Sequence, residues 1–101
     1  MRMLLIIHIP NEPFGSLVRS KEAGPLIGRL MDHLKPEVAY FGEQHGQRTG
    51  FAVIDVADAS MIPGICEPFF LHLDAECELC PVMTAEDLAK ADLDGIADKW
   101  A

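Results

Sequence analysis

The side chains best suited to proton chemistry in this sequence are a histidine, a tyrosine and two glutamates. His8 closes an apolar run near the N-terminus, and Tyr40 lies in a second apolar run. Glu76 and Glu78 share a third run, separated by one residue. An imidazole beside a carboxylate and a phenol can give and take protons on a small aromatic or enolisable compound. His8 and Tyr40 are therefore candidate catalytic residues. A histidine at a strand end is also commonly a hydrogen-bonded core or rim residue, and both interpretations stay open.

Further side chains could complete a ligand site around this group. Phe51 offers an aromatic surface, and His72 is expected to end a helix close to the glutamates. The polar stretch Asn11–Gly24 holds Arg19 and Lys21, whose charges could bind a carboxylate on the ligand. Long connections in small domains often carry function, which favours a role for this stretch. The candidate ligand-binding residues are Phe51, His72, Glu76, Glu78 and Arg19.

The cysteines predict neither a metal site nor a cofactor. Cys77 and Cys80 have the CxxC spacing of many metal and redox sites. In a strand, however, a spacing of three places the two side chains on opposite faces, where they cannot bind one ion together. Cys66 falls in an expected helix, and no second pair exists. We interpret the three cysteines as packing thiols without a disulfide framework. No phosphate loop or nucleophile elbow is present either.

The charge balance narrows the choice of partners. The net charge is −8, and the 8 basic residues are scattered among 16 acidic ones. Nucleic acid and anionic membrane surfaces need clustered positive charge, so both are disfavoured as partners. The apolar run Met3–Ile9 is too short to span a bilayer, and Pro10 ends it. It also lacks the cleavage site of a signal peptide, so we expect a cytoplasmic protein.

The elements that must position these residues follow from the hydrophobic periodicity. Strands are predicted over residues 2–9, 37–44, 47–57 and 75–82, and helices over 25–34, 60–72 and 84–100. Residues 11–24 are expected as a loop. Ser60 is expected to cap the second helix, and Pro68 inside it should leave the carbonyl of Gly64 without its helical partner. Thr84 and Asp87 predict a capping box for the last helix.

This order, βαββαβ with an extra C-terminal helix, predicts one α+β domain over residues 1–101. It favours a ferredoxin-like fold with an antiparallel sheet of order 4-1-3-2. His45 and Gly46 suit a two-residue hairpin turn, which places Tyr40 opposite Phe51. The same register places Glu43 opposite Arg48, where we expect a surface ion pair.

One face of the predicted sheet is too apolar to stay in water. Small aliphatic side chains on one face suit packing against helices. The opposite face carries Leu4, Ile6, Val38, Tyr40, Phe51 and Val53. An apolar patch of this size normally marks an interface, and two such sheets packed back to back would cover each other. The sequence therefore predicts a homodimer formed through the sheet face.

A resemblance supports this arrangement. The pattern LLIIHIPNEPF…KPEVAYFGEQHGQRTGFAVIDVADAS…EPFF…CPVMTAEDL resembles a family of short, uncharacterised bacterial proteins of the dimeric α/β-barrel superfamily. The similarity covers nearly the whole chain. The superfamily also contains muconolactone-isomerase-like and small cofactor-free monooxygenase-like proteins, to which the chain is similar at fold level only. The resemblance implies a barrel closed by two copies, but it brings no catalytic residues that match positions here.

Three functions remain open at this point. The first is a dimer that binds a small, partly aromatic metabolite in the barrel cavity. The second is a cofactor-independent isomerase-like or oxygenase-like enzyme that uses His8 as acid and base. The third is a non-catalytic structural or protein-interaction dimer. The surroundings of His8 distinguish the binding protein from the enzyme. An acid–base residue needs an open cavity, whereas a structural histidine is covered by its neighbours.

Overall fold

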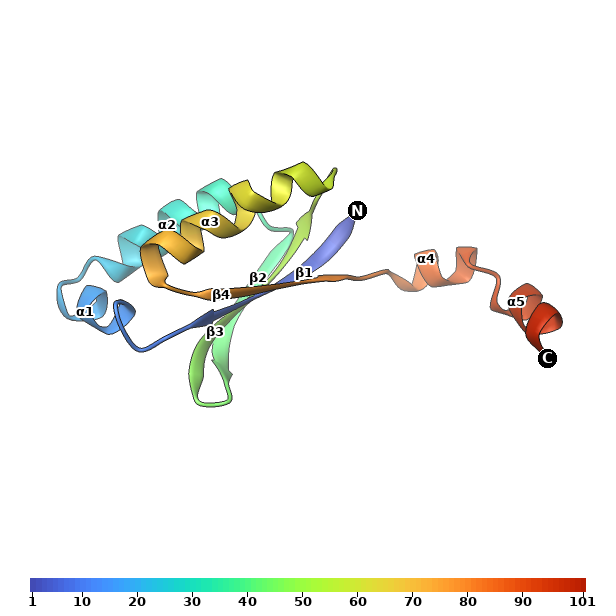
Figure 1. The fold of residues 1–101 in the computed structure, drawn as a ribbon, viewed down its shortest axis with the longest axis horizontal. Coiled ribbons are helices and arrows are strands. Elements are labelled where there is room, and N and C mark those ends of the chain that lie inside the picture. Colours follow the sequence, from blue (N-terminus) through green and yellow to red (C-terminus); the bar gives the residue numbers. More distant parts are fainter.

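The computed structural model describes all residues from Met1 to Ala101. Four antiparallel strands form one sheet of order β2-β3-β1-β4, which is the predicted order read from the other edge. The strands are β1 (Arg2–Ile9), β2 (Val38–Gln44), β3 (Gln47–Asp55) and β4 (Glu76–Pro81). Helices α2 (Ala23–Leu34) and α3 (Ile62–Leu73) cover one face of this sheet (Figure 1). The α+β class is confirmed, and the arrangement is compatible with a ferredoxin-like fold.

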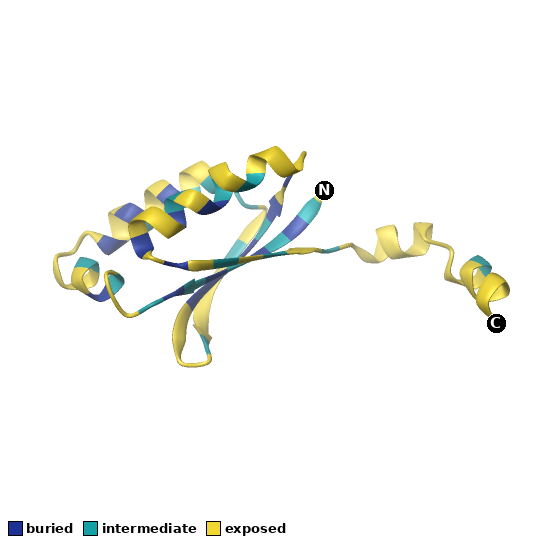
Figure 2. Ribbon diagram, in the orientation of Figure 1, coloured by how far each residue is buried: buried dark blue, intermediate teal, exposed yellow.

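The core lies between the sheet and its two helices. Alternate residues of β1 point toward the helices, and the burial of that strand alternates in step. Figure 2 shows the buried positions gathered between these two layers. The buried hydrophobic cluster consists of Met3, Leu5, Ile7, Ile9, Leu26, Leu30, Ala52, Ile54, Val56, Phe69, Leu73 and Ala75. Leu5 and Leu73 are fully enclosed, so truncating either to alanine should cost about 2–5 kcal/mol.

The hairpin between β2 and β3 has the predicted turn and register. His45 has φ 56° and Gly46 has φ 78°, as a two-residue turn with two left-handed positions requires. The expected ion pair across it does not form, and that prediction was wrong. The Glu43 carboxylate accepts a hydrogen bond from the Gly46 amide at 2.8 Å, because the turn leaves that N–H free. The Arg48 guanidinium lies 5.0 Å from the centre of the Phe14 ring.

The stretch expected as a loop contains a helix. Residues Phe14–Arg19 form α1, and α2 begins at Ala23 rather than at Pro25. The Glu12 carboxylate accepts hydrogen bonds from the Ser16 amide at 3.0 Å and from the Ser16 hydroxyl at 2.6 Å. This carboxylate satisfies a first-turn donor that a short helix otherwise leaves to water. The sequence did not predict this helix, because Pro13 and Gly15 are typical of turns.

Helix α3 begins and is capped differently from the expectation. A short 3-10 turn, η1 (Ala59–Met61), precedes it and is capped by Asp58. The N-cap residue of α3 itself is Met61, which makes no side-chain cap, so the expected cap by Ser60 was wrong. Asp58 accepts hydrogen bonds from the amide and the hydroxyl of Ser60. Pro68 lies inside α3 as predicted.

The C-terminal segment forms two helices instead of one. These are α4 (Ala85–Lys90) and α5 (Leu93–Trp100). The predicted capping box opens α4, with both reciprocal bonds between Thr84 and Asp87 present. Asp92 separates the helices, because it takes a left-handed conformation (φ 56°) and its carboxylate then caps α5 at the Gly95 amide. Figure 1 shows both helices extending beyond the end of β4, away from the two-layer body. None of the helices of the chain reaches the length and apolarity that crossing a membrane requires.

Candidate functional site

The sheet face opposite the helices is open and largely apolar. Leu4 and Ile6 of β1, with Phe51 and Val53 of β3, are half-buried there although no helix covers them. Tyr40 of the edge strand β2 is 68 % exposed. Alternation along each strand places these side chains on one face, as the sequence predicts.

The strand register sets the candidate site residues in two adjacent rows across this face. The first row runs Tyr40, Phe51, Ile6, Glu78. The second row runs Gly42, Thr49, His8, Glu76. Five of the predicted residues therefore share one face, and His8 lies in an inner strand with Glu76 directly beside it and Glu78 diagonal to it.

His8 is a mostly covered histidine paired with a glutamate. Its side chain is 11 % exposed, and its Nε2 lies 3.5 Å from Oε2 of Glu78, which is 61 % exposed. Thr49 beside it is buried, and its hydroxyl donates to the carbonyl of Gln47 at 3.0 Å rather than to the imidazole. The contact with the Glu78 carboxylate orients the imidazole ring. A small polar ligand could reach Glu78 far more readily than His8.

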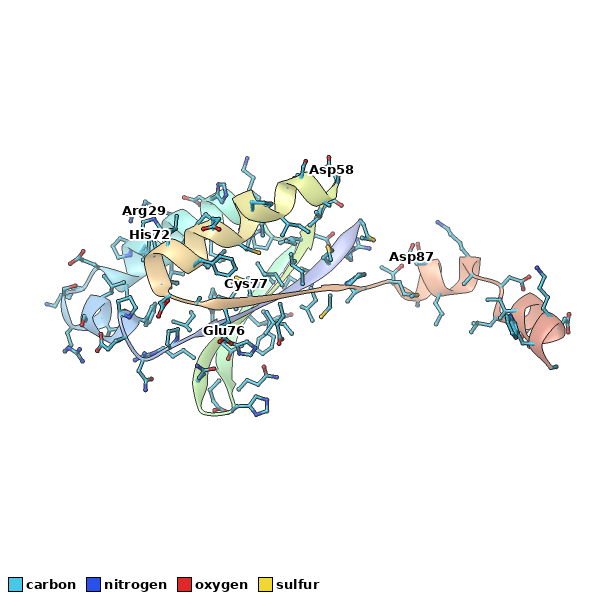
Figure 3. The ribbon with its side chains drawn as sticks, in the orientation of Figure 1. Arg29, Asp58, His72, Glu76, Cys77 and Asp87 are labelled. Carbon is cyan, nitrogen blue, oxygen red and sulfur yellow. The ribbon has the colours of Figure 1, made fainter.

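Arg19 and His72 are not brought to His8. The Arg19 guanidinium points back along α1 and pairs with Glu12, which precedes the helix, with 2.6 Å between Nη2 and Oε1. His72 is exposed on α3, in the helical layer, whereas Glu76 lies on the sheet (Figure 3). The expected position of His72 failed because the exit from α3 turns at Asp74, which has φ 52°, and the strand then runs along the sheet below the helix.

His72 instead lines a surface hollow of about 250 Å³ with Lys21 and Arg29. Figure 3 shows Arg29 and His72 side by side, although they come from different helices. Neither Lys21 nor Arg29 has an ion-pair partner in the chain, whereas Arg2 and Arg19 both pair with a glutamate. The hollow thus combines two cations that have no ion-pair partner with the carboxylate of Glu22, which also lines it. Arg29 could not be found from the sequence, because only the packing of α2 against α3 gives it these neighbours.

The cysteines sit on opposite sides of the sheet, which confirms the predicted alternation. Cys77 lies on the helix-facing side of the sheet close to Cys66 of α3, while Cys80 is exposed. Burial raises the pKa of Cys77 to about 12, with the neighbouring Cys66 adding to the rise. Burial likewise raises the pKa of Cys66. Both thiols are therefore protonated at pH 7 and poor nucleophiles. No group of three or more His, Cys, Asp or Glu side chains is placed to hold a metal ion.

The hollows of the single chain do not include the open face. None is lined by His8, Tyr40 or Glu78. A closed cavity over the two rows therefore needs a second body above them. No protein-family model matches the chain, and no curated protein matches it in sequence. Because a fold by itself does not assign an activity, the function has to be argued from this face.

Proposed function

We propose that the protein is a homodimer that binds a small, partly aromatic metabolite between the open sheet faces of its two copies. The observation that carries this proposal is the open face, on which an apolar strip meets aromatic and acidic side chains. Leaving Leu4, Ile6, Phe51 and Val53 beside water is unfavourable by roughly 25 cal/mol for each Å² of apolar surface. A second copy has the same apolar strip, and packing the two strips against each other removes both strips from water.

Two sheets packed in this way lie about 10 Å apart and would close the dimeric α/β barrel that the resemblance implies. Tyr40 and Phe51 would supply aromatic contacts to the ligand, and Glu76 and Glu78 would accept hydrogen bonds from its donors. His8 would hold Glu78 in position. The expected ligand therefore has an aromatic or flat apolar part and at least one hydroxyl or amine group.

The cover over His8 favours binding over catalysis. A general acid or base has to come within hydrogen-bond reach of the substrate proton. Only 11 % of the His8 side chain is exposed, and its Nε2 faces the Glu78 carboxylate at 3.5 Å. This arrangement supports a recognition pair more than the cofactor-independent isomerase-like or oxygenase-like chemistry that His8 and Tyr40 would otherwise perform.

Native mass spectrometry of the full chain purified from its own host tests the proposal. We expect a dimer that carries a small-molecule adduct, whose mass narrows the ligand class. The double variant Tyr40→Ala/Glu78→Gln should remain a dimer and lose the adduct. Glu67→Gln is the matched control, because it removes an equal charge from an exposed glutamate on α3 and should keep the adduct.

Results other than these would contradict either the metabolite, the location of its site or the dimer. A ligand-free dimer from the native host would remove the metabolite, and an adduct that survives the double variant would place its site elsewhere. A monomer at micromolar concentration would overturn the sheet-face dimer itself.

A further inference from the structure

The C-terminal residues 83–101, hereafter the arm, carry an apolar stripe that nothing in the chain covers. At helical spacing, Leu93, Ile96 and Trp100 fall on one side of α5, with Asp94 and Asp98 on another. Their exposed fractions are 57 % for Leu93, 45 % for Ile96 and 85 % for Trp100. A stripe of this kind is the normal mark of a helix that packs against another surface.

Helix α4 continues this apolar surface. Met83 and Leu88 are 64 % and 44 % exposed. A shallow notch of about 380 Å³ between α4 and α5 is lined by Leu88 and Leu93 together with Asp92 and Asp94. No residue of the arm is buried, and Figure 2 shows the arm in the yellow of exposed residues apart from a teal patch on α5. Helices of 6 and 8 residues are too short to be stable in water on their own, so the arm needs a packing surface.

The charge of the arm excludes a lipid surface as that packing surface. It has five acidic side chains, Glu86, Asp87, Asp92, Asp94 and Asp98, against Lys90 and Lys99. Helices that lie on membranes carry an excess of lysine and arginine on their polar face. An arm with the opposite balance is suited to a protein surface that offers apolar area and free positive charge.

We propose that each arm packs against the body of a second copy of this chain, so that the two copies exchange arms. This inference rests on the sheet-face dimer of the proposed function and adds a second contact to it. The arm leaves from β4, an edge strand of the sheet whose open face forms that dimer. A copy stacked on the open face therefore lies next to the start of the arm.

The area needed for a stable dimer supports the exchange. Strands of about eight residues in a four-stranded sheet present roughly 500 Å² per face. A stable interface buries about 800 Å² on each partner, so the sheet face alone falls short. Helices as short as α4 and α5 add roughly 200 Å² together. Each copy buries this additional area twice, once on its own arm and once on the part of its body that the other arm covers. The area buried on each copy then comes to about 900 Å².

The single tryptophan of the chain, Trp100, reports directly on this contact. In a dilution series of the full chain, molar mass from light scattering and the emission wavelength of Trp100 are followed together. We expect blue-shifted emission in the dimer and a red shift at the concentrations where the molar mass halves. Isotope-filtered nuclear Overhauser spectra on a mixed-label dimer should then show contacts from the Trp100 ring to body methyl groups of the other copy.

A matched pair of variants separates packing from charge. Ile96→Asp and Lys99→Gln each lower the net charge by one, but only Ile96 lies on the apolar stripe. Ile96→Asp should raise the dimer dissociation constant at least about tenfold and shift the Trp100 emission to the red. Lys99→Gln should change neither by more than about twofold.

This experiment distinguishes a failure of the exchanged arm from a failure of the sheet-face dimer. A dimer whose Trp100 emission stays red-shifted would overturn the exchanged arm and leave the sheet-face dimer standing. A monomer with blue-shifted emission would mean that the arm folds back on its own body, which overturns both. Contacts of Trp100 within one copy only would also refute the exchange.

Discussion

The carboxylate of Glu12 has the most heavily hydrogen-bonded surroundings of any acidic group on the surface of the chain. The Ser16 hydroxyl, the Arg19 guanidinium and the Ser16 amide lower the pKa of Glu12 to about 2, in that order of effect. Because the folded pKa lies below the ordinary value, the ionised carboxylate stabilises α1 above about pH 4.5, and this contribution is lost as the pH falls toward 2.

We predict that Arg19→Gln raises the pKa of Glu12 toward its ordinary value without abolishing the shift, because Ser16 keeps its two hydrogen bonds. A carbon-detected nuclear magnetic resonance titration of the Glu12 carboxyl measures this directly. Arg29→Gln is the control and should leave the Glu12 titration unchanged, since Arg29 lines the separate hollow with His72. A wild-type Glu12 that titrates at its ordinary pKa would contradict the geometry of α1.

At the scale of elements, one hydrogen bond ties the two covering helices together. Pro68 has no amide proton, so the Gly64 carbonyl in α3 lacks its helical donor. His33 of α2 donates to that oxygen through Nε2 at 2.9 Å. The carbonyl that Pro68 leaves free in one helix is thus satisfied by a side chain of its neighbour. The sequence indicated the free carbonyl but not the residue that would reach it.

This pairing predicts a measurable coupling. His33→Ala should lower the free energy of unfolding by about 1 kcal/mol, the usual net value of one hydrogen bond. In a Pro68→Ala background the same change should cost much less, because replacing the proline restores an amide donor inside α3. Urea unfolding of the wild type, the two single variants and the double variant gives the four free energies of this double-mutant cycle. Additive effects of the two substitutions would show that His33 does not serve this carbonyl.

Local rules explain which elements the sequence predicts well. The strands and their register depend on a period of two and on the turn at His45 and Gly46, and both signals are local. The predicted helix boundaries are wrong where a side chain caps a helix from a position that the sequence pattern did not indicate. Glu12 starts a helix in an apparent loop, and Asp92 divides the last helix by capping its second half.

The candidate site shows the same limit. Strand parity is enough to bring His8, Glu78, Tyr40 and Phe51 to one face. Helix packing decides where His72 and Arg29 lie, and it depends on side chains far apart in the sequence. A single chain also leaves both the open face and the arm uncovered, which no pattern within one element can resolve.

At the scale of the whole molecule, the chain is more extended than its length requires. The Cα radius of gyration is 17.1 Å and the principal extents are 60 × 28 × 19 Å. A compact chain of this length would have a radius of gyration of about 13 Å. The arm accounts for the excess, because the body is a compact two-layer unit and only the arm extends from it (Figure 1).

This shape makes the size of the dimer a test of where the arms go. A compact dimer with both arms packed would have a radius of gyration of roughly 16–17 Å, no larger than that of one extended chain. If the arms stayed extended, two chains with centres roughly 20 Å apart would give about 20 Å. Small-angle X-ray scattering should therefore show the forward scattering double on dimerisation while the radius of gyration stays near 17 Å. A rise of about 3 Å would mean that dimerisation leaves the arms free, and the apolar stripe of α5 would then need a different partner.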